Sequence, residues 1–181
     1  LDRDTTGALL FGTDGGLQSM LLHPTSRVYK VYVAECTGTL VPDAPERFRA
    51  GLVLEDGTQC APATVEVVPE PSSASDADGV SGGASAAPPP LTRVRVTLHE
   101  GFFHQVKRML ARCGVVVVGL HRERFGTLEA AGLAPGTMRA LTASERAMLC
   151  DMLPLDRIAQ REVGWERRGP SGSASGSAAP A

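Results

Sequence analysis

The sequence has little that would indicate metal, disulfide or nucleotide chemistry. Its four cysteines are widely spread and form no Cys-x-x-Cys pair, which argues against a zinc ribbon or a disulfide framework and fits a reducing compartment. The four histidines show no metal-ligand spacing. There is no P-loop and no G-x-G-x-x-G after a strand. We therefore expect neither a metal nor a cofactor.

Long hydrophobic runs and a strong net charge are also lacking. No apolar stretch is long enough to span a membrane, so we expect no membrane association. The formal net charge is −2, so the chain as a whole is not a basic nucleic-acid binder. Residues 101–124 are an exception, because they hold five basic residues against one acid and could form a local basic face. These basic residues are Lys107, Arg108, Arg112, Arg122 and Arg124.

The patterning predicts an α+β domain with a largely antiparallel sheet and flanking helices, and 181 residues suffice for a real core. Alternating or apolar segments predict strands at 28–36, 63–68, 93–99 and 115–120, the last buried on both faces. Residues 8–11 read as a further core-facing strand. Helices are expected at 17–22, 44–50, 104–113 and 142–152, the last opened by a capping box at Thr142 and Glu145.

Two stretches break every pattern. Residues 70–90 and 169–181 consist mainly of Ser, Ala, Gly and Pro, which cannot bury enough apolar area to offset ordering. We interpret the first as a disordered insertion between two paired strands and the second as a disordered tail. The domain organisation predicted is therefore a catalytic domain at 1–152, a C-terminal extension at 153–168 and the tail.

Three local patterns place candidate functional residues. In residues 104–113, Val106, Met109, Leu110 and Cys113 fall on one helix face, with Arg108 and Arg112 opposite. In residues 28–36, Lys30 and Tyr32 share one strand face; from the residues alone, an ordinary exposed lysine beside a half-buried tyrosine is the favoured explanation. Asp2 lies on a loop before an apolar run, where a rigid element could hold a reactive carboxylate.

Together, several motifs resemble the pseudouridine synthases, in particular the RsuA-like branch that modifies ribosomal RNA. They occur in the family's order and extend from Leu1 to about Met152, with the 70–90 insertion excepted. The Glu-Gly-x-x-His-Gln-Val-Lys-Arg-Met segment is the most specific. The segments are LDRDTTG (1–7), TDGG (13–16), KVYV (30–33), HEGFFHQVKRM (99–109), LHRERFG (120–126) and LAPGTMRALT (133–142).

The resemblance implies roles for particular residues. Asp2 matches the family's essential aspartate, Tyr32 the tyrosine that lies against the target base, and Lys107 the basic partner of the aspartate. Either Val106 or Met109 would line the pocket. The resemblance also implies RNA contacts, for Arg108 and Arg112 in particular, while Arg122 and Arg124 are equally well explained as surface residues paired with Glu123 or Glu100. The remaining candidates for RNA contact are Lys30, two residues before Tyr32, and His104 and His121, which could instead be packing residues.

The implied reaction is isomerisation of a specific uridine to pseudouridine in ribosomal RNA, by a monomer that needs no cofactor. An opposite charge favours the ionised form of a carboxylate, which suits Lys107 beside Asp2; whether Asp2 acts as nucleophile or as base stays open. The alternatives are a catalytically inactive RNA-binding assembly factor and a non-functional fragment. The chain begins inside a motif, so we expect the full protein to carry upstream residues. The low-complexity stretches favour a eukaryote with a GC-rich genome, and hence a chloroplast, or else a mitochondrial, location.

Overall fold

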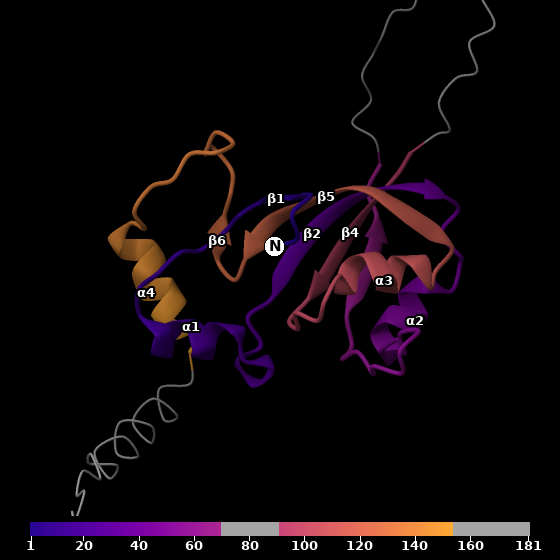
Figure 1. The fold of residues 1–181 in the computed structure, drawn as a ribbon, viewed down its shortest axis with the longest axis horizontal. Helices are drawn as coiled ribbons and strands as arrows, with labels where there is room; N and C mark the ends of the chain where they lie inside the picture. Colours follow the sequence, from indigo (N-terminus) through magenta and orange to yellow (C-terminus); the bar gives the residue numbers. More distant parts are fainter. Residues whose placement is uncertain (70–90, 154–181) are drawn as a thin grey trace, which may run out of the picture.

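A computed structural model describes residues 1–69 and 91–153 (Figure 1). The predicted insertion at 70–90 and nearly all of the region beyond Met152 lie outside the described residues. The elements, in chain order, are β1 (Thr5–Gly7), α1 (Gly15–Leu22), η1 (Pro24–Ser26), β2 (Lys30–Gly38), α2 (Ala44–Ala50), β3 (Thr64–Val67), β4 (Thr92–Leu98), α3 (Gln105–Ala111), β5 (Val115–Phe125), β6 (Leu128–Glu129) and α4 (Ala143–Asp151).

The strands form one sheet in the order β1-β5-β2-β4-β3, with β6 paired to the end of β5. All pairs are antiparallel except β1 with β5. The predicted α+β class is therefore confirmed, and the one parallel pair makes the sheet mixed. β3 and β4 pair with each other, which confirms that residues 63–68 and 93–99 are partner strands on either side of the 70–90 segment.

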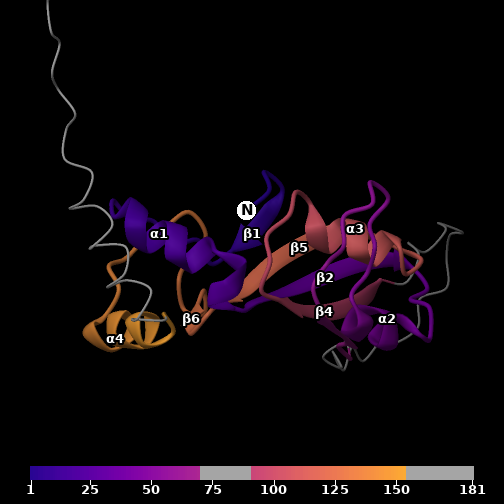
Figure 2. The same ribbon diagram turned by 90° about the horizontal axis from the view of Figure 1, so that it is seen from below.

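Helices α2 and α3 cover one side of the sheet and enclose the main core (Figures 1 and 2). Val94, Val96 and Leu98 of β4 face these helices and are almost completely buried. The four apolar residues predicted to share one face of the 104–113 helix are all buried, at 5% exposure or less. The sequence therefore predicted correctly which side of α3 packs on the sheet.

Strand β5 differs from the prediction. It extends to Phe125 instead of ending at Leu120, and it is not buried on both faces, because Val116 and Val118 are 64% and 58% exposed. The reason is that α2 and α3 cover only one side of the sheet, toward which Val115 and Leu120 point. Two register shifts in its pairing with β2 mark bulges within this long strand.

A second, smaller core joins α1 and α4 to the end of β5. Asp14 begins α1 by accepting a hydrogen bond from the Leu17 amide at 3.0 Å. The predicted capping box of α4 is present, with Thr142 and Glu145 each accepting from the other's backbone amide. Phe125 and Leu149 are buried in this cluster. These contacts confirm the helices expected at 17–22 and 142–152.

The predicted core-facing strand at residues 8–11 is wrong. Leu9 is 50% and Phe11 73% exposed, and the strand that does form, β1, comprises Thr5–Gly7 just before them. Only Leu10 of this apolar run packs against the smaller core. The segment links the sheet to α1, so it has no partner strand that would align its side chains with the core.

Candidate active site

β1 holds the N-terminal segment beside the centre of the sheet. Gly7 has φ 107° and lies against β5, where an added Cβ would stand 2.2 Å from the Arg122 carbonyl oxygen. Only glycine fits this conformation and this close approach. The following Ala8 exchanges two hydrogen bonds with Arg122, one from its amide at 2.9 Å and one to its carbonyl at 2.7 Å. Strand pairing thus fixes the turn that carries Asp2.

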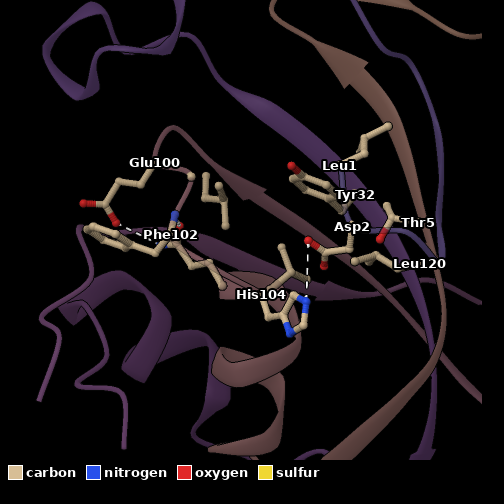
Figure 3. Close-up of a pocket in the computed structure, with 12 residues that line it drawn as sticks. Leu1, Asp2, Thr5, Tyr32, Glu100, Phe102, His104 and Leu120 are labelled. Carbon is tan, nitrogen blue, oxygen red and sulfur yellow. Dashed lines mark hydrogen bonds and ion pairs between the residues drawn. The ribbon is translucent and has the colours of Figure 1, made fainter. Parts of the chain in front are cut away.

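Asp2 lies in a pocket lined by the N-terminal turn, β2, the end of β4 and the loop before α3 (Figure 3). Its side chain is 26% exposed. Tyr32 lies on the same side of the pocket as Asp2, and Thr5 and Leu120 lie next to the Asp2 carboxylate (Figure 3). The pocket is therefore accessible from solvent but partly apolar.

The structure distinguishes the two candidates for the apolar residue at the pocket. Val106 lines it, together with Leu98 and Leu120, whereas Met109 is completely buried in the main core. Leu98 and Leu120 could not be chosen from the sequence, because many core residues show the same alternating pattern.

Lys107 brings a positive charge to the N-terminal turn, although its nearest partner is not Asp2. Its Nζ donates to both carboxylate oxygens of Asp4 at 2.7 Å and lies 3.9 Å from Oδ2 of Asp2. The hydrogen bond from Lys107 holds the pKa of the Asp4 carboxyl below its usual range. The expected proximity of Lys107 and Asp2 is present, and Asp4 as a competing partner is new.

His104, which the sequence left as either a packing residue or an RNA contact, lines the pocket beside Asp2. Its Nε2 lies 3.9 Å from Oδ1 of Asp2, and its ring points toward that carboxylate (Figure 3). The backbone has φ 49° and ψ 31°, the left-handed region, directly before α3. Such a conformation costs on the order of 1–2 kcal/mol for a residue other than glycine. The motif around it was the only available signal.

Buried hydrogen bonds fix the loop between β4 and α3. Lys30 is 4% exposed, and its ammonium group donates to the carbonyl oxygens of His99 at 3.0 Å and Glu100 at 3.2 Å. Gln105 is also buried; it donates to Glu100 at 2.9 Å and accepts from the Phe102 amide at 3.1 Å. These bonds give the pocket wall a defined backbone position.

The burial of Lys30 corrects the expectation of an exposed lysine. Burial first, and then the nearby Arg122 charge, lower the pKa of Lys30 from 10.5 to about 8. Its ammonium group bonds to backbone carbonyl oxygens, so its observed contacts support the loop and do not present a cation to solvent.

The predicted basic face is mostly neutralised. Arg108 is paired with Glu55 at 2.6 Å and Asp56 at 2.7 Å. Arg124 is exposed and paired with Glu129. These acids differ from Glu123 and Glu100, which the sequence suggested as ion-pair partners.

The other two arginines of this face differ in burial. Arg122 is 7% exposed, donates to the Ala8 carbonyl and lies over the Phe125 ring at 5.2 Å. Arg112 is exposed and makes no ion pair with any residue in 1–69 or 91–153. Of the four arginines expected to contact RNA, Arg112 alone is both exposed and without an ion pair among the described residues.

Neither a metal site nor a membrane-spanning helix is present in the part of the chain that the structure describes. Within residues 1–69 and 91–153, no group of three or more His, Cys, Asp or Glu side chains is arranged to hold a metal ion. No helix in the same part of the chain is long and apolar enough to cross a membrane.

The fold is that of a pseudouridylate synthase, as its likeness to a solved structure shows. The family described as RNA pseudouridylate synthase matches residues 1–112, more than half of the chain, and the chain belongs to that family. A solved structure of a pseudouridylate synthase superposes with a TM-score of 0.67 at 29% identity, covering 82% of this chain and 56% of the other.

Several bacterial proteins are similar to this chain. Ribosomal small subunit pseudouridine synthase A of Escherichia coli K12 is 37% identical over 150 residues, covering 81% of this chain and 55% of its own length. An uncharacterized RNA pseudouridine synthase of Mycobacterium tuberculosis H37Rv is 36% identical over 149 residues, covering 82% and 52%. The chain thus spans about half the length of these relatives.

Proposed function

We propose that this protein isomerises a uridine of ribosomal RNA to pseudouridine, with Asp2 as its central reactive group. The observation that carries the proposal is that Asp2 and Tyr32 line one pocket and that Lys107 Nζ lies 3.9 Å from the Asp2 carboxylate, although the three residues are separated by 30 and 75 positions in the sequence. Family membership and a relative named for the small ribosomal subunit support the choice of reaction and of RNA.

The reaction breaks the bond between the sugar C1′ and the base N1, turns the base, and joins C1′ to C5. The C5 proton leaves and N1 gains a proton, so product and substrate have the same composition. An ionised Asp2 would act as nucleophile or as base toward the sugar. Lys107 favours that ionised form, because an opposite charge within about 4 Å stabilises a carboxylate.

The uridine must leave its stack to reach Asp2. Base flipping costs a few kcal/mol, and stacking on an aromatic ring contributes on the order of 1–3 kcal/mol. Tyr32 is half-buried in the pocket wall beside Asp2, where its ring could cover the base (Figure 3). Exposed cations such as Arg112 would contribute phosphate contacts that weaken with salt.

The alternative is an inactive RNA-binding assembly factor. Such a protein needs a basic surface and does not need a carboxylate with a nearby ammonium group in a pocket. The neutralisation of Arg108 and Arg124 by acids makes the described surface less suited to that role than the sequence suggested.

The proposal also includes that the protein acts as a monomer and that it acts on organellar ribosomes, those of the chloroplast first and of the mitochondrion second. These two parts rest on the sequence, and the relatives named above are bacterial.

Tritium release tests the proposal directly. A ribosomal RNA transcript labelled at uridine C5 would be incubated with the wild type, Asp2→Asn and, as a matched control, Asp151→Asn at the exposed end of α4. We expect release by the wild type and the control and none by Asp2→Asn. Equal release by Asp2→Asn would refute the role of Asp2. Salt-sensitive binding without release by any protein would support the assembly factor.

A further inference from the structure

An exposed aromatic ring stands beside the pocket. Phe103 is 76% exposed, although burying such a ring usually stabilises a protein. It belongs to the loop between β4 and α3, one residue before His104, which lines the pocket. The proposed chemistry uses Asp2, Tyr32 and Lys107 and gives Phe103 no task.

Phe103 already forms half of an aromatic stack. Its ring lies parallel to that of His104, with centroids 3.8 Å apart and an angle of 20°. This separation is close to the spacing of stacked bases in a nucleic-acid strand, about 3.4 Å. Since His104 covers only one face and the side chain is 76% exposed, the ring can accept a second flat group on its other face.

The stack starts at the candidate reactive carboxylate. His104 Nε2 lies 3.9 Å from Asp2 Oδ1, and Phe103 stacks on His104. From the pocket outward the spatial order is therefore Asp2, His104 and Phe103. A nucleotide held at Asp2 would have its neighbours in the RNA strand within reach of the outer ring, since adjacent bases are only a few ångströms apart.

Hydrogen bonds hold the backbone around Phe103 in the loop between β4 and α3. The carbonyl oxygens before Phe103 are held by Lys30, and the Phe102 amide by the buried Gln105. The Phe103 carbonyl itself accepts from Arg108 at 3.4 Å. The left-handed backbone of His104 is thus maintained by the surrounding bonds, and a ring on a fixed backbone loses little entropy when it binds.

We propose that Phe103, supported by His104, is a stacking platform for the nucleobase next to the uridine that enters the pocket. This inference rests on the proposed function, because it takes Asp2 as the place of the target nucleotide. The platform prefers a flat base in single-stranded or unpaired RNA and does not select its identity, because every base offers a π-face.

Fluorescence of a base analogue tests the platform without requiring the isomerisation. The probes are cytidine decamers with a single central uridine and 2-aminopurine directly 5′ or directly 3′ of it. We expect the wild type and Asp2→Asn to quench one of the two probes when saturated. Phe103→Ala should abolish that quenching and weaken binding roughly five- to 150-fold, the range that base–aromatic stacking supplies, while Phe103→Trp should restore both.

The matched control is Phe11→Ala, which removes another strongly exposed phenylalanine, 73% accessible and not part of the pocket. It should quench and bind as the wild type does. Thermal unfolding should be nearly unchanged in the Phe103 variants, because exposed side chains contribute little to stability.

The outcomes separate the two proposals. Quenching that depends on Phe103, in a protein that releases no tritium, would support the platform and reject the synthase. Tritium release together with probe binding that leaves both probes unquenched, or quenching that persists in Phe103→Ala, would overturn the platform alone. Failure of the wild type to bind either decamer would also overturn it.

Discussion

Lys107 and Asp4, which are 103 positions apart in the sequence, form a bidentate ion pair. The Lys107 Nζ lies 2.7 Å from each carboxylate oxygen of Asp4. Asp4 is 71% exposed, so water screens this pair. Asp2 is farther from the same ammonium group, at 3.9 Å, and is better shielded. Asp4 therefore orients Lys107 at the pocket and also competes with Asp2 for its charge.

Removal of Lys107 is expected to slow catalysis. Lys107→Met deletes the ammonium group 3.9 Å from the Asp2 carboxylate and its electrostatic stabilisation of charge there, so turnover should fall by roughly tenfold or more. Asp4→Asn is the matched variant: it keeps Lys107 and releases it toward Asp2, so turnover should stay near that of the wild type. Equal turnover of Lys107→Met and the wild type would contradict this role of Lys107.

Substitution of Gly7 should show whether the pairing of β1 with β5 positions Asp2, apart from its effect on the stability of the protein. Gly7→Ala forces a side chain into a positive-φ position against the Arg122 backbone, and we expect the free energy of unfolding to fall by more than about 1 kcal/mol. Activity should be lost even where the protein remains folded, because β1 would leave β5 and carry Asp2 away.

Gly15→Ala is the control, since Gly15 begins α1 and nothing lies within 4 Å of an added Cβ. Its expected effect is a stabilisation of up to about 1 kcal/mol with unchanged turnover. Full activity of folded Gly7→Ala, measured beside its circular dichroism, would contradict the need for β1 pairing.

The buried Lys30 should give a measurable pH dependence of stability. Its pKa is about 8 in the folded protein against an ordinary 10.5, so between these values the unfolded chain binds more protons than the folded one. The free energy of unfolding of the wild type should therefore rise relative to Lys30→Met by about 2 kcal/mol between pH 8 and pH 10.

Denaturant titrations of both proteins at several pH values measure this difference. Burial raises the pKa of the Cys36 thiol to about 11, which acts in the opposite direction, but Cys36 is present in both proteins and cancels. Parallel stability curves for wild type and Lys30→Met would show that the ammonium group is not desolvated.

Salt dependence should distinguish the arginines of α3. Arg112 is unpaired among the described side chains, so Arg112→Ala should reduce the slope of log K against log salt for RNA binding by about one. Arg108→Ala should leave the slope nearly unchanged, because Glu55 and Asp56 already balance that charge. A larger slope change for Arg108 than for Arg112 would reverse this assignment.

The sequence by itself determined the features that depend on local periodicity. The buried face of α3, the alternation in β4 and the capping box of α4 follow from the spacing of residues within a few turns or a single strand. The antiparallel pairing of β3 with β4 could also be predicted, because both strands alternate and flank one long insertion. The motif order located Asp2, Tyr32 and Lys107.

Only the tertiary structure decided how charges are shared and which apolar segments are buried. The Lys107–Asp4 pair and the contacts of Arg108 with Glu55 join residues more than 50 positions apart, so no local pattern records them. Lys30 shares the strand pattern of an exposed lysine but lies beneath the loop that it stabilises. Residues 8–11 are apolar, yet none of them is buried and Leu9 and Phe11 are exposed, because burial depends on what packs against a segment as well as on its composition.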